Sequence, residues 1–188
     1  MSYPPGEKQC GDCSLCCKIM AITELNKPKD VWCDHVIKKR GCGIYETRPQ
    51  SCRAFQCLWL LDPRLPPEWK PNKSKFVMVG DSRTELVVHV DSNSPGAWRH
   101  EPYLSGLRSM AERGQKHGML VVIIEGGKST VLLSDREVPV GVLQDDDRLV
   151  SGQVATLSGS RFEVKVMKAD EAARLADTAL GWRRPKSP

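Results

Sequence analysis

The cysteines of this chain are confined to its first third. All eight lie between Cys10 and Cys57, and residues 58–188 contain none. Thiols at this density are expected to bind metal, to pair as disulfides or to be exposed to oxidation. The distribution therefore concentrates the chemistry of the chain in one short segment. In order, the cysteines are Cys10, Cys13, Cys16, Cys17, Cys33, Cys42, Cys52 and Cys57.

The same segment has little material for an apolar core. Up to about Asp62 it is rich in Cys, Gly and Pro and poor in aliphatic residues, and domains this small usually need disulfides or metal to stay folded. Later runs such as Met119–Ile124 can build an ordinary core. We predict a cysteine-cluster metal-binding domain over residues 1–64 and an α+β domain of unassigned role over 72–184. The proline-rich stretch Leu65–Pro71 is the expected linker.

Metal is favoured over disulfides as the partner of these thiols. The N-terminal residues lack the basic and apolar regions of a secretory signal, and no apolar run approaches the roughly 18 residues of a membrane span. We therefore expect a cytoplasmic protein with no membrane association. In that reducing compartment dense cysteine patterns bind metal more often than they pair. Disulfides or a redox dithiol stay open as the alternative, although the adjacent Cys16 and Cys17 are an awkward disulfide pair.

The first four cysteines are expected to face one way. On a helix, Cys10, Cys13, Cys16 and Cys17 fall within one stripe about 120° wide, and on a loop their spacing can wrap a cluster. Zinc takes four thiolates in a closed tetrahedron, so eight cysteines could hold one or two ions. An iron–sulfur cluster also takes four thiolates. Ligand count does not separate these cofactors, and all eight cysteines are the predicted metal ligands. His35 is expected beside the site as a surface or supporting group.

Three stretches of this segment resemble the YkgJ-like cysteine-cluster family. They are CGDCSLCC over 10–17, WCDH over 32–35 and CGIYETRPQSCRAFQC over 42–57. The family carries a CxxCxxCC motif described as zinc- or iron-chelating. The resemblance implies a bacterial, cytoplasmic metal-binding protein in which the cysteines are the ligands. It implies no catalytic residue, and the biochemical role of the family is mostly undefined.

Charge and motifs argue against several other functions. Residues 1–60 carry a formal charge of +3, which eight thiolates would change to −5 and two zinc ions would return to −1. Binding to nucleic acid is therefore not the favoured function. It stays open as an alternative explanation of the basic residues. No nucleophile, acid/base pair or nucleotide loop is recognisable, so we lean against an enzyme. The main alternative is an iron–sulfur redox protein or electron carrier. A protein partner would fit a structural or binding role, but no feature identifies one.

Hydrophobic patterning predicts the rest of the fold. A helix is expected from Thr47 to Leu61, with Tyr45, Phe55 and Trp59 as the shielding core of the small domain. Cys52 and Cys57 would lie about 140° apart on this helix, so either they bind different metals or the helix breaks near Gln56. An amphipathic helix over Glu101–His117 is terminated by Gly118. A closing helix is expected over 169–181. The predicted strands are paired as antiparallel hairpins and cover 31–37, 42–45, 75–80, 85–90, 119–125, 129–133, 138–143, 149–154 and 162–167.

Overall fold

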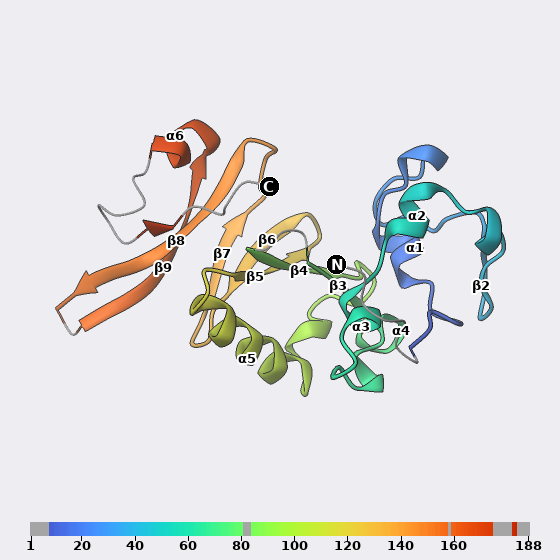
Figure 1. The fold of residues 1–188 in the computed structure, drawn as a ribbon, viewed down its shortest axis with the longest axis horizontal. Coiled ribbons are helices and arrows are strands. Elements are labelled where there is room, and N and C mark those ends of the chain that lie inside the picture. The colour runs from blue at the N-terminus through green and yellow to red at the C-terminus, as the bar shows by residue number, and fades with distance from the viewer. Residues whose placement is uncertain (1–7, 81–83, 158, 175–181, 184–188) are drawn as a thin grey trace. The chain divides into compact units, whose positions relative to one another are not determined.

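The protein contains helices and antiparallel strands, as the predicted α+β class requires (Figure 1). The chain divides into two compact units, one made of residues 1–80 and 87–105 and the other of residues 81–86 and 106–188. The computed structural model describes residues 8–80, 84–157, 159–174 and 182–183.

Short elements carry the cysteines of the first unit. A 3₁₀ helix is written η. These elements are α1 (Leu15–Ile19), η1 (Thr23–Leu25), β1 (Val36–Ile37), β2 (Gly41–Cys42), η2 (Tyr45–Thr47), α2 (Gln50–Ala54) and α3 (Leu58–Leu61). The unit continues with η3 (Pro67–Trp69), α4 (Pro71–Ser74), β3 (Phe76–Gly80), β4 (Glu85–Val90) and η4 (Ala97–Arg99). Such short elements cannot be stable alone, so contacts between them must hold the unit together.

The helix predicted from Thr47 to Leu61 is wrong as a single element. The chain forms η2, then α2, and α3 begins only after an extended Phe55 (φ −73°, ψ 124°) and Cys57 (φ −75°, ψ 155°). No side-chain cap opens α2, and the residue before it is Pro49 rather than Thr47. Helix α2 buries no side chain, and α3 buries only Trp59. No continuous apolar face therefore runs through both segments to favour one long helix.

An aromatic cluster fills the second half of this unit. The rings of Trp69, Phe76 and Tyr103 meet edge to face, with centroids 5.2–5.9 Å apart, the arrangement that the ring quadrupoles favour. The Tyr103 hydroxyl donates to the Glu68 carbonyl at 3.0 Å. Trp69 is only 5% exposed, so the stretch expected to be an open linker supplies part of an apolar core.

The second unit is built from helices and β-hairpins. The helix α5 (Tyr103–Gln115) begins in the first unit and buries Leu107, Ala111 and Gly114 along one face. Gly118 (φ 73°) lies in the left-handed conformation just after it, which ends the helix as predicted. The strands are β5 (Leu120–Glu125), β6 (Lys128–Leu132), β7 (Glu137–Gly141), β8 (Asp147–Thr156), β9 (Gly159–Lys168) and β10 (Trp182–Arg183).

The strands within the described residues form three sheets. Strands β1 and β2 pair as a two-stranded hairpin, β3 to β7 form a five-stranded sheet in chain order, and the third sheet has the order β10-β8-β9. In the five-stranded sheet β5 and β6 are joined by Gly126 (φ 57°) and Gly127 (φ 78°). Positive φ at both turn residues is what a tight two-residue hairpin needs. Pro139 is accommodated because β7 is an edge strand.

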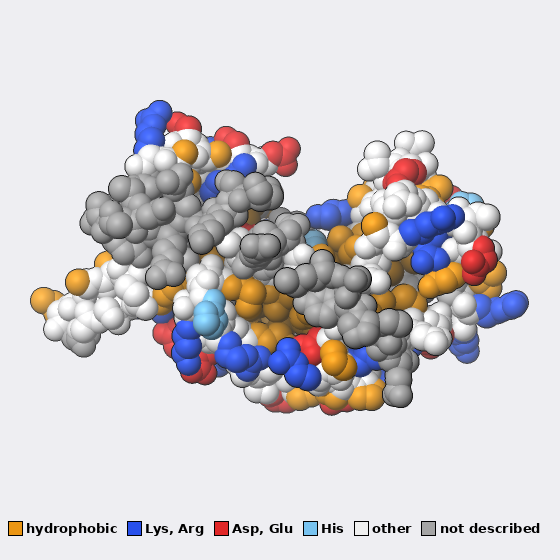
Figure 2. All heavy atoms as spheres, in the orientation of Figure 1, with side chains coloured by type: hydrophobic (Ala, Val, Ile, Leu, Met, Phe, Trp, Pro, Cys, Tyr) orange, Lys and Arg blue, Asp and Glu red, His pale blue; other side chains and the backbone are white. Residues whose placement is uncertain are grey.

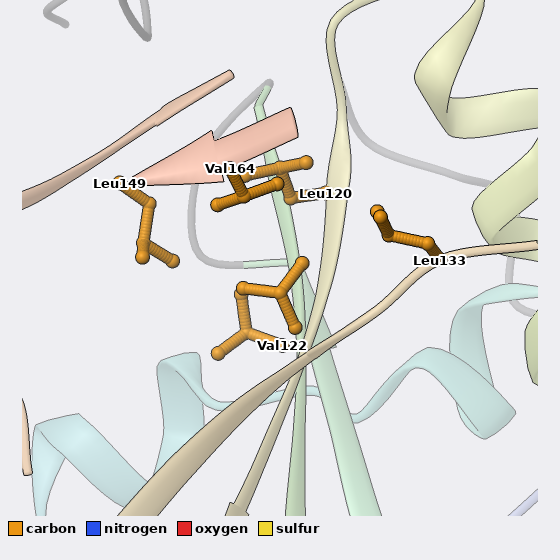
Figure 3. Packing of buried hydrophobic residues seen from close by; sticks show 6 residues of the cluster. Leu120, Val122, Leu133, Leu149 and Val164 are labelled. Carbon is orange, nitrogen blue, oxygen red and sulfur yellow. The ribbon is translucent and has the colours of Figure 1, made fainter. Parts of the chain in front are cut away.

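An apolar cluster joins the hairpins of the second unit. Leu120 and Val122 of β5 pack with Leu133, Leu149 and Val164 (Figure 3). Leu133 is fully buried and the other four are at most 6% exposed. Because these side chains come from segments more than ten residues apart, their burial fixes how β8 and β9 meet the strands before them. This core contains no cysteine.

The β8–β9 hairpin is longer than predicted. Its register runs without interruption from the Asp147–Lys168 pair to the Thr156–Gly159 pair. The sequence predicted strands only where apolar residues alternate, over 149–154 and 162–167. The polar residues at both ends of these stretches also pair. Helix α6 (Ala169–Arg174) follows directly and packs on the hairpin through Ala172 (Figure 1). The predicted continuation of this helix to residue 181 lies outside the described residues.

Candidate functional site

One cavity of the first unit brings the cysteines together. It has a volume of about 280 Å³ and lies among the short elements between residues 10 and 71. All eight cysteines line it, although they come from segments as far apart as Cys10 and Cys57. All eight are free thiols. Figure 2 shows hydrophobic side chains, a class that there includes cysteine, at the surface around α1 and β2 beside Lys and Arg side chains.

The first four cysteines use both of the predicted geometries. Cys10 and Cys13 lie in a turn closed by the Cys13 amide, which donates to the Cys10 carbonyl at 2.9 Å. Cys16 and Cys17 lie in α1, a helix whose Leu15 and Ile19 are buried one turn apart. The sequence allowed either a helix or a loop for these four cysteines. The structure uses a loop for the first two and a helix for the last two, and all four line the cavity.

The other four cysteines come from separate elements. Cys33 precedes β1 and Cys42 ends β2; Cys52 lies in α2, and Cys57 precedes α3. The Cys33 amide donates to the Cys17 carbonyl at 3.1 Å, which joins the second cysteine segment to α1. The Val36 amide donates to the Cys33 carbonyl at 3.0 Å, and Val36 pairs with Cys42 across the hairpin. Backbone contacts thus connect Cys17, Cys33 and Cys42 in sequence.

Helix α2 is tied to the loop after α1. Glu24 of η1 accepts hydrogen bonds from the Ser51 amide at 3.0 Å and the Ser51 hydroxyl at 2.8 Å. These bonds lower the pKa of the Glu24 carboxyl. A carboxylate at the start of a helix also suits its dipole. The contact orients α2 and so sets the direction from which Cys52 enters the cavity.

Part of the expected shielding core lies at the surface instead. Trp59 is buried, as predicted, and Phe55 is half-buried, but Tyr45 is 50% exposed. The Arg48 guanidinium stacks on the Tyr45 ring at 3.8 Å and donates to the Tyr45 carbonyl. Arg53 donates to the carbonyls of Arg48 and Glu46, both at 2.9 Å. These arginines therefore support the backbone around α2.

The turn that carries Cys10 and Cys13 packs tightly against the β1–β2 hairpin. A β-carbon placed on Gly41 (φ 95°) would lie 2.7 Å from the Gly11 carbonyl oxygen. This distance is too short for any other residue type. Since Gly11 lies between the first two cysteines and Gly41 precedes Cys42, this contact holds two walls of the cavity together.

Gly41→Ala is expected to open this wall and to destabilise the first unit. Positive φ costs an alanine about 1–2 kcal/mol, and the clash with Gly11 adds about 1–3 kcal/mol. Gly96→Ala is the matched control, because Gly96 also has positive φ (73°) but open space around its Cα. Denaturant unfolding of the intact protein would compare them. Equal losses for both variants would show that the Gly41–Gly11 contact contributes nothing.

Two buried lysines near the thiols were not anticipated from the sequence. Lys18 is 3% exposed and Lys27 is 7% exposed. The Lys18 ammonium forms an ion pair with Asp91, which follows β4. The Lys27 ammonium donates to the carbonyls of Lys18 and Met20 at the end of α1. A positive charge at the C-terminal end of a helix is favourable, and an unpaired buried lysine would be costly.

Two further lysines lie by the first cysteine turn. The ammonium groups of Lys8 and Lys70 lie over the Trp59 ring, 4.9 and 5.5 Å from its centroid. Lys70 also pairs with Asp12 at 2.9 Å, and Lys8 donates to the Asp62 carbonyl at 2.6 Å. The Trp59 ring and the Asp62 carbonyl therefore hold these ammonium groups close to the thiols. In this position the lysines can offset the negative charge of thiolates.

Burial favours the protonated form of four of these thiols. Burial raises the pKa of Cys10, Cys13, Cys52 and Cys57 above the ordinary thiol value, because a buried thiolate loses its hydration. The pKa of Cys17 is shifted in the opposite direction. A hydrogen bond from Cys16 lowers the pKa of Cys17 to about 7, and the Lys27 charge acts in the same direction. Metal binding to Cys10, Cys13, Cys52 and Cys57 would release protons and would strengthen with rising pH.

The thiols line the cavity without converging on one point. Within the described ranges, no three or more His, Cys, Asp or Glu side chains form a group that could hold a metal ion as they stand. The donor set itself fits zinc or an iron–sulfur cluster, since thiolates are the ligands of both. Rotation about χ1 moves a cysteine sulfur among staggered positions, so binding would require such adjustment. His35 also lines the cavity, and its side chain is exposed.

Comparison with protein family models, with curated proteins and with solved structures found no match to this chain. Among the residues that the structure describes, no helix has both the length and the apolar character needed to cross a membrane.

Proposed function

We propose that the cysteine thiolates that line the cavity bind either zinc or an iron–sulfur cluster. The proposed role of the bound metal is structural or lies in binding a partner. One observation carries the proposal: eight free thiols from six separate segments line a single cavity. Eight cysteines without a shared function would not be expected to line the same cavity. The resemblance to the YkgJ-like family supports the same function, with the same eight cysteines as ligands. No catalytic role is assigned.

The proposed metal replaces the apolar core that the cysteine segment lacks. Its elements are two to five residues long and depend on contacts with one another. Thiolate ligation would join them at their cysteines and supply folding free energy on the order of 10 kcal/mol per structural zinc. The buried Lys27 and the ring-held Lys8 and Lys70 would offset the negative charge of the bound thiolates. The cytoplasm is the proposed location, because a reducing compartment keeps free thiols available.

Metal and sulfide analysis of anaerobically isolated protein tests this function. We expect either zinc without sulfide, or iron with a comparable amount of inorganic sulfide and visible absorption. The second result would favour the redox alternative, an iron–sulfur electron carrier. The matched control is a variant with Cys13, Cys33, Cys52 and Cys57 all replaced by serine, which should carry no metal. Equal metal content in both proteins, or none in either, would overturn the proposal.

A further inference from the structure

We infer that the surface around the β1–β2 hairpin docks a protein segment that presents acidic and apolar side chains. The inference rests on the partner-binding role in the proposed function and names the class of partner. The surface, which we call the hairpin surface, combines exposed apolar side chains with exposed cations. These residues are Val31, Trp32, Ile37, Lys38, Lys39, Arg40 and Tyr45.

Large apolar side chains are concentrated at the hairpin surface. Four of them, between residues 31 and 45, are each 44–50% exposed. Single exposed apolar residues are ordinary, whereas a group of them marks a binding surface. In the described part of the chain β1 and β2 pair only with each other, so no neighbouring strand covers this group. The other exposed large apolar side chains of the described residues lie in the second unit and are Val142, Leu157 and Val166.

Backbone contacts gather the apolar side chains of the hairpin surface. A hydrogen bond of 3.0 Å closes the turn over residues 33–36, so Trp32 and Ile37 flank the same turn. The Ile37 side chain lies against Gly43, where an added β-carbon would be 3.1 Å from Ile37 Cδ1. Tyr45 follows two residues later and is half exposed. Residues from both sides of the hairpin therefore contribute to one surface.

Positive charge lies beside these apolar side chains. Lys38, Lys39 and Arg40 connect β1 to β2, and all three are exposed. Among the described residues none of the three takes part in an ion pair. Arg48, stacked on the Tyr45 ring, adds a fourth cation. Acidic groups of a partner can therefore pair with this turn without breaking a native ion pair, and such complementarity selects partners.

Two acidic side chains at the same surface favour a protein over nucleic acid or anionic lipid. Asp30 and Asp34 lie two residues before and after Trp32, and both are exposed. A surface covered with phosphate would be repelled by both carboxylates. A protein segment can instead place acidic side chains near the lysines and an apolar side chain on Trp32. Tryptophan, tyrosine and arginine are also the residue types that most often carry the energy of protein interfaces.

Binding of defined peptides to the full chain tests the hairpin surface. The probe is a short fluorescent peptide in which Asp and Glu alternate with Leu and Phe, and a second peptide has Lys at each acidic position. Fluorescence anisotropy should show that the acidic peptide binds at least about tenfold more tightly. Trp32→Ala/Ile37→Ala should weaken its binding about tenfold. Val142→Ala, at an exposed apolar position of the second unit, is the matched control and should change nothing.

Charge reversal supplies a readout that misfolding cannot imitate. Lys38→Glu/Arg40→Glu should bind the acidic peptide about tenfold more weakly and the lysine peptide about tenfold more tightly than the wild type does. Lys116→Glu, at an exposed position of the second unit, should keep the wild-type preference. A wild type with no preference for the acidic peptide, or a reversed variant with the wild-type preference, would overturn the proposal.

The same samples separate the other occupants of this surface. Tighter binding of single-stranded oligothymidylate, or of vesicles of phosphatidylcholine and phosphatidylserine, than of the acidic peptide would assign the surface to nucleic acid or to a membrane and overturn the proposal. A wild-type dimer that dissociates in Trp32→Ala/Ile37→Ala would assign it to a second copy of the chain, with the same consequence.

Metal analysis of the wild type distinguishes failure of this inference from failure of the proposed function. A metal-free wild type that keeps the preference for the acidic peptide would overturn metal binding and support the surface. A metal-loaded wild type without that preference would overturn only the surface.

Discussion

Removing the metal from the intact protein is expected to unfold residues 10–60 and to leave the core of the second unit folded. The cysteine segment has short helices and strands and few buried aliphatic side chains, so the proposed ligation supplies most of its stability, on the order of 10 kcal/mol per zinc. Hydrogen exchange with and without a chelator measures this directly. Amide protection over residues 10–60 should fall to that of an unfolded chain.

The strands β5 and β6 provide an internal control for this experiment. They contain no cysteine, pair with each other from Val121–Leu132 to Glu125–Lys128, and supply Leu120, Val122 and Val131 to the apolar cluster of Figure 3. Their protection should not change when the metal is removed. If protection over residues 10–60 were also unchanged after complete metal removal, the ions would not be structural. If both regions lost protection together, the two parts would not fold independently.

The second large effect is expected from the buried ion pair behind α1. Lys18 and Asp91 have side chains only 4% and 10% exposed. Replacing Asp91 by Asn keeps an oxygen that can accept from the Asn93 amide, a contact of 3.0 Å in the native protein, but leaves the Lys18 ammonium without its counter-charge. Loss of one partner of a buried pair costs about 3–5 kcal/mol. Denaturant unfolding of the metal-loaded protein should show a loss of this size.

An exposed ion pair of the same unit is the matched control. Asp12 is 58% exposed and pairs with Lys70 at 2.9 Å, so Asp12→Asn should cost only about 0–1 kcal/mol. A Lys18→Met/Asp91→Leu variant should recover most of the stability lost in Asp91→Asn, because two apolar side chains leave no unpaired charge. Equal stability of Asp91→Asn and Asp12→Asn would refute the importance of the buried pair.

The elements that the sequence predicted well are those with a strong local pattern. Helix α5 has apolar residues at helical spacing and a glycine at its end, and the β5–β6 hairpin has two glycines between apolar strands. Each signal lies within about fifteen residues, so no distant contact is needed to read it. The spacing of Cys10, Cys13, Cys16 and Cys17 is also a local signal, and all four line the cavity.

What the sequence missed depends on distant contacts. Lys18 and Asp91 are 73 residues apart, and nothing local shows that a lysine after two cysteines is buried. Trp69 lies in a proline-rich stretch that looked like a linker, yet it packs on Phe76 and Tyr103. The break between α2 and α3 was only one of two alternatives for the spacing of Cys52 and Cys57. Tertiary packing decides each of these cases.

Native mass spectrometry of the full chain, isolated without oxygen, tests the central claim most directly. Intact mass measures bound metal, and alkylation after denaturation counts the free thiols. The proposal predicts a chain that carries metal or an iron–sulfur cluster, with all eight cysteines open to alkylation once the metal is removed. A chain with four disulfides and no bound metal would contradict it.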